Sequence, residues 1–257
     1  MRAARSLLGS YGGAIYLFLY APIALLVLFS FNASPSGTLP ISGFTLRWYR
    51  ELFDDYFLID AMLNSLTVAA IATPVATIVG GLCAYALART EFRLKPLVSS
   101  TVLMPMIVPG LLLGAAMLLI LRPLLGVPLS LWTAACGHVV VTTPYAVMAI
   151  GNRLYGYDRR LDAAASDLGA PPWRVLRHVT IPLLMPGILA AALIVFTVSL
   201  DTFGITFFTI GSDGTLPMYI WSQVELGIRP TVNALGTLLI AVSILLLSLA
   251  QLLLRRR

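Results

Sequence analysis

Six long apolar stretches, separated by short polar segments, dominate the 257-residue chain. An α-helix needs about 20 mostly apolar residues to cross the hydrocarbon core of a bilayer. Each stretch meets this length, and backbone groups in lipid are satisfied within helices. The pattern predicts an all-α fold, a polytopic membrane helix bundle, in one domain over residues 1–257. The predicted spans cover about 11–31, 61–88, 98–121, 130–150, 184–207 and 233–254.

The composition excludes an ordinary soluble domain. Hydrophobic residues make up 59% of the chain and charged residues 11%, with a mean hydropathy of +0.91, whereas soluble domains carry about 25% charged residues. Cys83 and Cys136 both lie in apolar stretches and are interpreted as small buried hydrophobes. The apolar run that follows Arg2 and Arg5 is longer than the 7–15 or so residues of a signal peptide core, which predicts a retained first span.

The basic residues predict the orientation in the membrane. Six spans place both termini on one side, and if that side is the cytoplasm, thirteen Lys and Arg residues lie inside and four outside. The outer four are Arg47, Arg50, Arg122 and Arg229. The positive-inside rule therefore predicts cytoplasmic termini and a cytoplasmic segment at residues 151–183, and the charge of +6 marks orientation, not nucleic-acid binding.

Known catalytic and nucleotide-binding patterns are missing from the sequence. The one lysine, Lys95, is not part of a Gly-x-x-x-x-Gly-Lys-Ser/Thr loop, so the chain cannot bind ATP in that way. His138 and His178 have no carboxylate or cysteine at metal-ligand spacing, and no Ser/His/Asp set has a geometric basis. The sequence predicts no enzyme activity, no cofactor and no metal site in this chain.

Residues 161–182, within the cytoplasmic segment at 158–182, form the longest polar interruption between two apolar stretches in the second half of the chain. The sequence predicts a short helix, a left-handed helix end at Gly169, and a second helix started by Pro171 or Pro172. Leu161 and Leu168 flank alanines at helical spacing, and Trp173, Leu176 and Val179 form a second apolar stripe. Such a loop either docks onto another protein or covers its own bundle, and the pattern alone leaves both interpretations open.

Asp201 is the one acidic residue inside a predicted span. An intramembrane carboxylate costs about 2.5–3.5 kcal/mol on insertion scales, so it tends to face a cavity or a partner group. It either contacts a cationic solute in a pathway or lies at the water interface or against a partner chain. Thr202 and Phe207 are candidate neighbours in such a pathway. In addition, residues 46–53 and 216–226 are predicted as short amphipathic helices, and Pro105 and Pro109 as a kink.

Gly169 is followed by nine residues and then by Val179, Thr180, Ile181 and Pro182. This spacing resembles the EAA motif of the membrane subunits of type I ABC importers, which is Glu-Ala-Ala, three residues, Gly, nine residues, Ile, one residue and Leu-Pro. Two alanines match the motif at Ala164 and Ala165. Its glutamate is replaced by Ala163, and an acidic residue, Asp162, stands one position earlier.

Further segments resemble the spermidine/putrescine permease branch of this family, in particular its second membrane subunit. They are SGFTLRWYRELF at 42–53, SLD at 199–201, TLPMYIWSQVELGI at 215–228 and TVNALGTLL at 231–239. Polyamine-type relatives often carry an acidic pair after Ser-Leu, whereas here Asp201 is followed by Thr202. The likeness covers about residues 11–254.

The resemblance implies the type I importer permease fold in a bacterial inner membrane and a machine of several chains. A second permease subunit would complete the pathway in the lipid bilayer, two ATPase subunits would bind ATP and magnesium, and an extracytoplasmic binding protein would deliver the cargo. The ATPase-coupling residues it implies are Asp162, Ala163, Ala164, Ala165, Gly169, Ala170, Pro172, Ile181 and Pro182.

The expected function is that of a permease subunit that forms half of the pathway for polyamines. The alternatives are a permease of this class for another solute, such as an opine, thiamine or a ferric ion complex, and a stand-alone secondary transporter. A secondary transporter more often shows inverted repeats and ion-coupling residues near the membrane midplane, which are not evident here.

Overall fold

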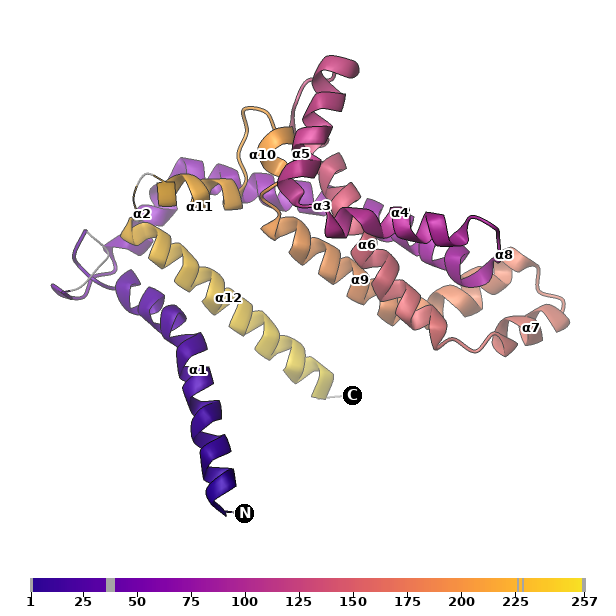
Figure 1. The fold of residues 1–257 in the computed structure, drawn as a ribbon, viewed down its shortest axis with the longest axis horizontal. Coiled ribbons are helices and arrows are strands. Elements are labelled where there is room, and N and C mark those ends of the chain that lie inside the picture. Colours follow the sequence, from indigo (N-terminus) through magenta and orange to yellow (C-terminus); the bar gives the residue numbers. More distant parts are fainter. Residues whose placement is uncertain (1, 36–39, 226, 228, 256–257) are drawn as a thin grey trace. The chain divides into compact units, whose positions relative to one another are not determined.

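A computed structural model describes residues 2–35, 40–225, 227 and 229–255, and its regular structure is helical apart from an isolated antiparallel bridge between Asn32 and Phe44 (Figure 1). It divides into two compact units, Met1–Ile59 with Tyr219–Arg257, and Asp60–Met218. The helices are α1 (Arg2–Ser30), α2 (Arg47–Asp54), α3 (Tyr56–Arg89), α4 (Lys95–Ile107), α5 (Gly110–Leu119), η1 (Ile120–Leu124), α6 (Leu131–Tyr155), α7 (Arg160–Asp167), α8 (Pro172–Val175), η2 (Leu176–Thr180), α9 (Ile181–Asp201), α10 (Thr206–Thr209), α11 (Leu216–Glu225) and α12 (Pro230–Arg255).

All six apolar stretches are largely helical. Within the described residues, four helical segments are long and apolar enough to cross a membrane: Gly9–Ser30, Tyr56–Arg89, Leu131–Tyr155 and Pro172–Asp201. The pair Lys95–Ile107 and Gly110–Leu124 meets the same criteria together, and Pro230–Leu245 is a shorter apolar helix. The prediction of an all-α membrane fold is confirmed.

Small residues let three helices approach closely in the unit Asp60–Met218. A Cβ on Gly80 of α3 would lie 2.5 Å from the Cβ of Ala146 in α6, and a Cβ on Gly187 of α9 would lie 2.9 Å from the Cβ of Arg153. Helices α6 and α9 lie side by side (Figure 1), and small residues at such contacts are typical of membrane bundles. The buried core at these helices consists of Ala76, Ala84, Ala146, Val147, Ile150, Leu154, Leu184, Ala191 and Val195.

The helix over the third apolar stretch is broken at Val108 and Pro109, and its two halves are bent by 105°. Proline has no N–H and pushes the residue before it out of the helical region. Val108 is accordingly extended, with φ −74° and ψ 131°. Pro105 lies inside α4, so the second of the two prolines marks the break.

Helix α9 ends at Asp201, six residues before the end of the apolar stretch. Thr202 is extended, and Gly204 passes directly over the start of α5, where a Cβ would lie 2.8 Å from the backbone nitrogen of Leu111. This close approach of two backbones requires a glycine and is incompatible with a continued α9. The chain resumes as the short helix α10, in which Thr206 and Thr209 are buried, and Ile205 directly before it is buried as well.

The unit Met1–Ile59 with Tyr219–Arg257 contains the antiparallel pair α1 and α12, and the N-terminal end of α1 lies at the same end of this pair as the C-terminal end of α12 (Figure 1). The predicted short helices are confirmed as α2 and α11. In α2, the Trp48 indole N–H donates to the carbonyl of Asn32 at 2.7 Å. In α11, the Tyr219 hydroxyl donates to Asp55 at 2.6 Å.

Candidate functional site

Helix α7, in the predicted ATPase-coupling segment, ends in a Schellman turn. The Ala170 N–H donates to the carbonyl of Ala165 at 3.1 Å, and the Gly169 N–H donates to the carbonyl of Ser166 at 2.9 Å. Gly169 has a φ of +82°, the left-handed conformation that glycine adopts without strain. The sequence-based prediction of a helix end at Gly169 is therefore confirmed.

The second helix begins at Pro172, where the missing N–H of a proline leaves no intrahelical bond unmade. It continues through the π-helical turn η2 into α9. The turn shifts the buried face: Val175 and Thr180 are buried, whereas Trp173 of the predicted stripe is exposed. The apolar periodicity assumed an uninterrupted α-helix, and π turns are rare and commonly occur at functional sites.

Large apolar side chains stand exposed on this segment. Leu168, at the end of α7, is 89% exposed, Trp173 is 66% exposed and Leu161 is 47% exposed. Ala163 and Ala164 are exposed between the leucines, and Ala165 is half-buried. Singly exposed apolar residues are ordinary, but several of them on one short segment make a candidate interaction surface. We call Leu161, Leu168 and Trp173 the apolar docking face, after the docking role that the resemblance implies for this segment.

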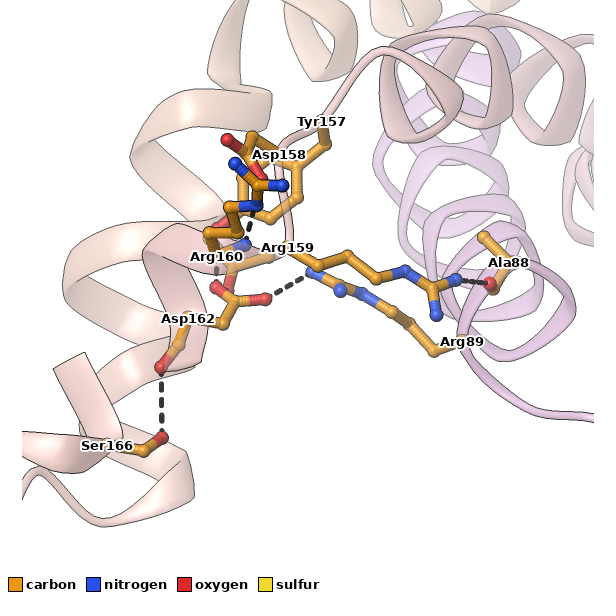
Figure 2. Close-up of polar contacts among 9 residues, drawn as sticks. Ala88, Arg89, Tyr157, Asp158, Arg159, Arg160, Asp162 and Ser166 are labelled. Atoms are coloured by element: carbon orange, nitrogen blue, oxygen red, sulfur yellow. Dashed lines mark hydrogen bonds and ion pairs between the residues drawn. The ribbon is translucent and has the colours of Figure 1, made fainter. Parts of the chain in front are cut away.

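Asp162, in the first turn of α7, faces its own chain. Its Oδ1 accepts hydrogen bonds from the hydroxyls of Tyr157 and of Thr180, the latter at 3.0 Å, and its Oδ2 pairs with the guanidinium of Arg89 (Figure 2). One carboxylate therefore joins the end of α3, the loop before α7, α7 itself and η2. Its neighbour Ala163, at the glutamate position of the motif, is exposed and supplies no such group.

Tyr157 is a stable hydrogen-bond donor to this carboxylate. Burial raises the pKa of its phenol, and the hydrogen bond to Asp162 raises it further, more than Thr180 and Arg89 lower it. The phenol is therefore protonated at neutral pH. Sequence reasoning missed Arg89, Tyr157 and Thr180, because only their spatial meeting at Asp162 distinguishes them.

The other predicted coupling residues lie at both ends of the second helix. Ala170 is half-buried beneath the Gly169 turn, and Pro172 is exposed at the first helical position. Ile181 is half-buried and Pro182 exposed at the start of α9. A single continuous segment, from α7 to the first turn of α9, therefore carries all nine of these residues.

The predicted pathway residues gather where α9 ends. Asp201 is the exposed last residue of α9, and no described residue pairs with its carboxylate. The Thr202 hydroxyl donates to the carbonyl of Val198 at 2.7 Å, and its own carbonyl accepts from Thr206. Phe207 is half exposed, with the ring of Phe203 5.6 Å away and that of Phe208 5.2 Å away. An acid and exposed aromatic surface thus lie next to each other in the chain.

A buried polar network behind this region was not foreseen. The His138 side chain of α6 is 1% exposed, and its ring nitrogens lie 2.7 Å from the hydroxyls of Ser199 in α9 and Thr206 in α10. The sequence signal was only a histidine in an apolar stretch, which left a packed or a water-facing residue open. The structure places it in the packed interior, joining three helices.

The sequence and fold were compared with those of known proteins. The family model of the binding-protein-dependent transport system inner membrane component matches residues 76–257. The spermidine/putrescine transport system permease protein PotC of Escherichia coli (strain K12) is 39% identical over 252 residues, covering 98% of this chain and 95% of that protein. PotC of Haemophilus influenzae is 41% identical over 243 residues, covering 94% of each.

A solved structure shares the fold at low sequence identity. A bacterial ABC transporter involved in the import of the acidic polysaccharide alginate matches with a TM-score of 0.73 at 14% identity, covering 99% of this chain and 96% of that chain. The expected importer-permease fold is therefore confirmed. The chain belongs to the family of binding-protein-dependent transport system inner membrane components.

Proposed function

We propose that this chain is one of two permease subunits of an ATP-driven importer for polyamines and that it forms half of the translocation pathway. The observation that carries the proposal is the likeness, over 98% of the chain, to a protein named as a spermidine/putrescine permease. As a member of its family, the chain is a multi-pass, non-catalytic inner-membrane subunit of a binding-protein-dependent transport system.

In this proposal the segment from α7 to the first turn of α9 docks onto a partner ATPase. The exposed Leu168 and Trp173 support it, because a groove on the partner would remove their apolar surface from water. The Schellman turn at Gly169 holds α7 and α8 at a defined angle. ATP and magnesium are bound by the ATPase, and its closure moves α7.

The proposed orientation puts both termini, with α7, in the cytoplasm. The thirteen-to-four distribution of basic residues supports it. The antiparallel α1 and α12 support it as well, since both termini then lie on one side (Figure 1). The start of α3 and helices α2 and α11 then face the extracytoplasmic binding protein.

Asp201, Thr202 and Phe207 are proposed to line the path of the cargo. Polyamines are cations at neutral pH, and the segment carries an exposed carboxylate at Asp201 and, six residues later, a half-exposed aromatic ring at Phe207, which offer charge attraction and a cation–π contact. The exposure of Asp201 and Phe207 supports this role. If the Asp201 carboxylate only anchored the end of α9 at the membrane interface, the effect of removing it on uptake would not depend on the charge of the cargo.

Reconstitution tests the proposal. Proteoliposomes with this chain, the second permease and the ATPase, given ATP inside and the binding protein with labelled spermidine or putrescine outside, are expected to accumulate label. Leaving out ATP, the ATPase or the binding protein should each abolish uptake. Uptake by this chain alone would establish a stand-alone transporter, and stronger competition by thiamine, an opine or a ferric complex than by unlabelled polyamine would overturn the cargo.

A further inference from the structure

Two arginines cross between the end of α3 and the start of α7 in opposite directions. Arg89, the last residue of α3, reaches Asp162 in α7, and Arg159, just before α7, donates to the carbonyl of Ala88 in α3 (Figure 2). We call these four residues, Ala88, Arg89, Arg159 and Asp162, the α3–α7 clasp. Each contact is independent of the other, so the two elements are joined twice.

Helix electrostatics favour both contacts. The last carbonyls of a helix lack intrahelical partners, and the negative end of the helix dipole attracts cations. Arg159 satisfies one such carbonyl, and Arg89 lies in the last turn of α3. Asp162 is the acidic residue in the first turn of α7, where the dipole favours a negative charge.

The Arg89 side chain is held in place before any partner binds. Its guanidinium lies 4.9 Å from the ring centroid of Tyr157 and 5.6 Å from that of Tyr85. The side chains of Arg89 and Asp162 are 15% and 21% exposed, so their ion pair is screened less than a pair on the open surface. By contrast, the pair of Lys95 and Glu91 nearby leaves the glutamate 89% exposed.

The coupling segment therefore has two separate surfaces. Leu161, Leu168 and Trp173 point into solvent and leave the apolar docking face open. Asp162 is turned inward and has three partners in its own chain. The acidic side chain next to the motif's glutamate position thus faces the membrane part of this subunit and not a docking partner.

We propose that Arg89 is a positioning residue that ties the coupling segment to α3 through the α3–α7 clasp. This rests on the proposed docking of α7 onto an ATPase. When the ATPase moves α7, the clasp moves the end of α3 with it, in addition to the movement carried along α8, η2 and α9. Loss of the clasp leaves docking and ATP hydrolysis in place but lets α7 move without α3.

The complete transporter in proteoliposomes tests this, with ATP hydrolysed per cargo molecule imported as the readout. Arg89→Gln and Asp162→Asn are each expected to assemble with the ATPase, to hydrolyse ATP at close to the wild-type rate and to raise that ratio at least fivefold. The double variant Arg89→Gln with Asp162→Asn should raise the ratio no further than the larger of the two single effects, because both substitutions remove the same contact. The matched control is Lys95→Gln, which removes the same charge from the exposed pair and should leave the ratio unchanged.

Arg159→Gln provides a second variant, because Arg159 is exposed and, among the described residues, its side chain bonds only a backbone carbonyl. This variant should raise the ratio of ATP hydrolysed to cargo imported about two- to threefold. If Arg89→Gln does not assemble, the ratio in Arg159→Gln alone tests the clasp. A ratio equal to that of the Lys95→Gln control in both arginine variants, or additive effects in the double variant, overturns the clasp. Failure of the wild-type assembly to import polyamine would instead overturn the proposed function.

Discussion

The Thr206 hydroxyl lies 2.7 Å from Nε2 of His138. Because that hydroxyl donates its own proton to the carbonyl of Thr202 at 2.8 Å, it accepts from His138, and Nε2 carries a proton. In the neutral imidazole Nδ1 then accepts from Ser199. This arrangement satisfies every member of a polar network that is buried between α6, α9 and α10.

His138→Ala is expected to destabilise the protein by about 2–4 kcal/mol, because it removes a buried ring and leaves buried hydroxyls with fewer partners. The thermal midpoint of the detergent-solubilised chain measures the effect. His178 is exposed and bonds a carbonyl of its own helix, so His178→Ala should change the stability by less than about 0.5 kcal/mol. Equal midpoints for the two variants would contradict a structural role for His138.

Gly169→Val should reduce coupled uptake several-fold, because a β-branched residue is strongly disfavoured at a φ of +82° and the turn must rearrange. Gly169→Asn, which tolerates this conformation better, should retain most uptake. Gly126 has a φ of +65° and, like Gly169, open space around a built Cβ, so Gly126→Val is a control for strain alone. If both valine variants lose uptake equally, the Gly169 turn has no special part in coupling.

Tyr219 gives a prediction for high pH. Burial and then the hydrogen bond to Asp55 raise the pKa of its phenol above the ordinary value of about 10, more than Arg229 lowers it. A folded-state pKa above the unfolded one means that this stability is complete below about pH 10 and is lost as the pH rises through the raised value. Tyr219→Phe should cost about 1 kcal/mol, constant between about pH 6 and 9 and shrinking above that range.

Thermal midpoints measured against pH check the Tyr219 prediction. Tyr56 is 85% exposed, so Tyr56→Phe should follow the wild-type curve throughout. A gap between wild type and Tyr219→Phe that changed below pH 9 would count against the raised pKa.

Asp201→Asn should lower polyamine uptake several-fold while leaving the subunit assembled, because the exposed carboxylate is proposed to attract a cationic cargo. Raising the salt concentration should narrow the difference in uptake between wild type and Asp201→Asn, because salt screens the attraction between carboxylate and cation. Asp213 is also exposed, in the loop before α11, and Asp213→Asn removes the same charge as a control. Unchanged uptake in Asp201→Asn would reassign Asp201 to a structural position at the end of α9.

The features that the sequence predicted are local or follow from composition. Apolar runs of sufficient length located the helices, and the glycine followed by prolines predicted the turn at Gly169, because its Schellman bonds join residues at most five positions apart. The helix after Asp201 could not be foreseen, since α9 ends where Gly204 meets α5 and hydropathy does not register a contact between two backbones.

The chemistry of the candidate site was harder to predict. Arg89 and Asp162 are 73 positions apart, and Arg89 counted only as one of thirteen inner charges. Trp173 was predicted to share one apolar stripe with Leu176 and Val179, but the π turn changes the helical phase, and Trp173 is exposed while Val175 is buried. The sequence singled out Asp162 only as an acidic residue one position before the glutamate position of the motif. Its carboxylate turns toward its own chain because Arg89, at the end of α3, lies beside it.

The π turn at Leu176–Thr180 lies within the interval that separates Gly169 from Pro182. Such a turn holds one residue more than an α-helical turn, and each residue of an α-helix rotates the chain by about 100°. If the same residues formed a regular α-helix instead, α8 and the Gly169 bend would turn by about that angle relative to α9, and Val175 would leave the buried face that it shares with Thr180. The number of residues between Gly169 and Pro182 therefore sets the rotation of α8 relative to α9 as well as their separation, and with it the direction in which the apolar docking face points.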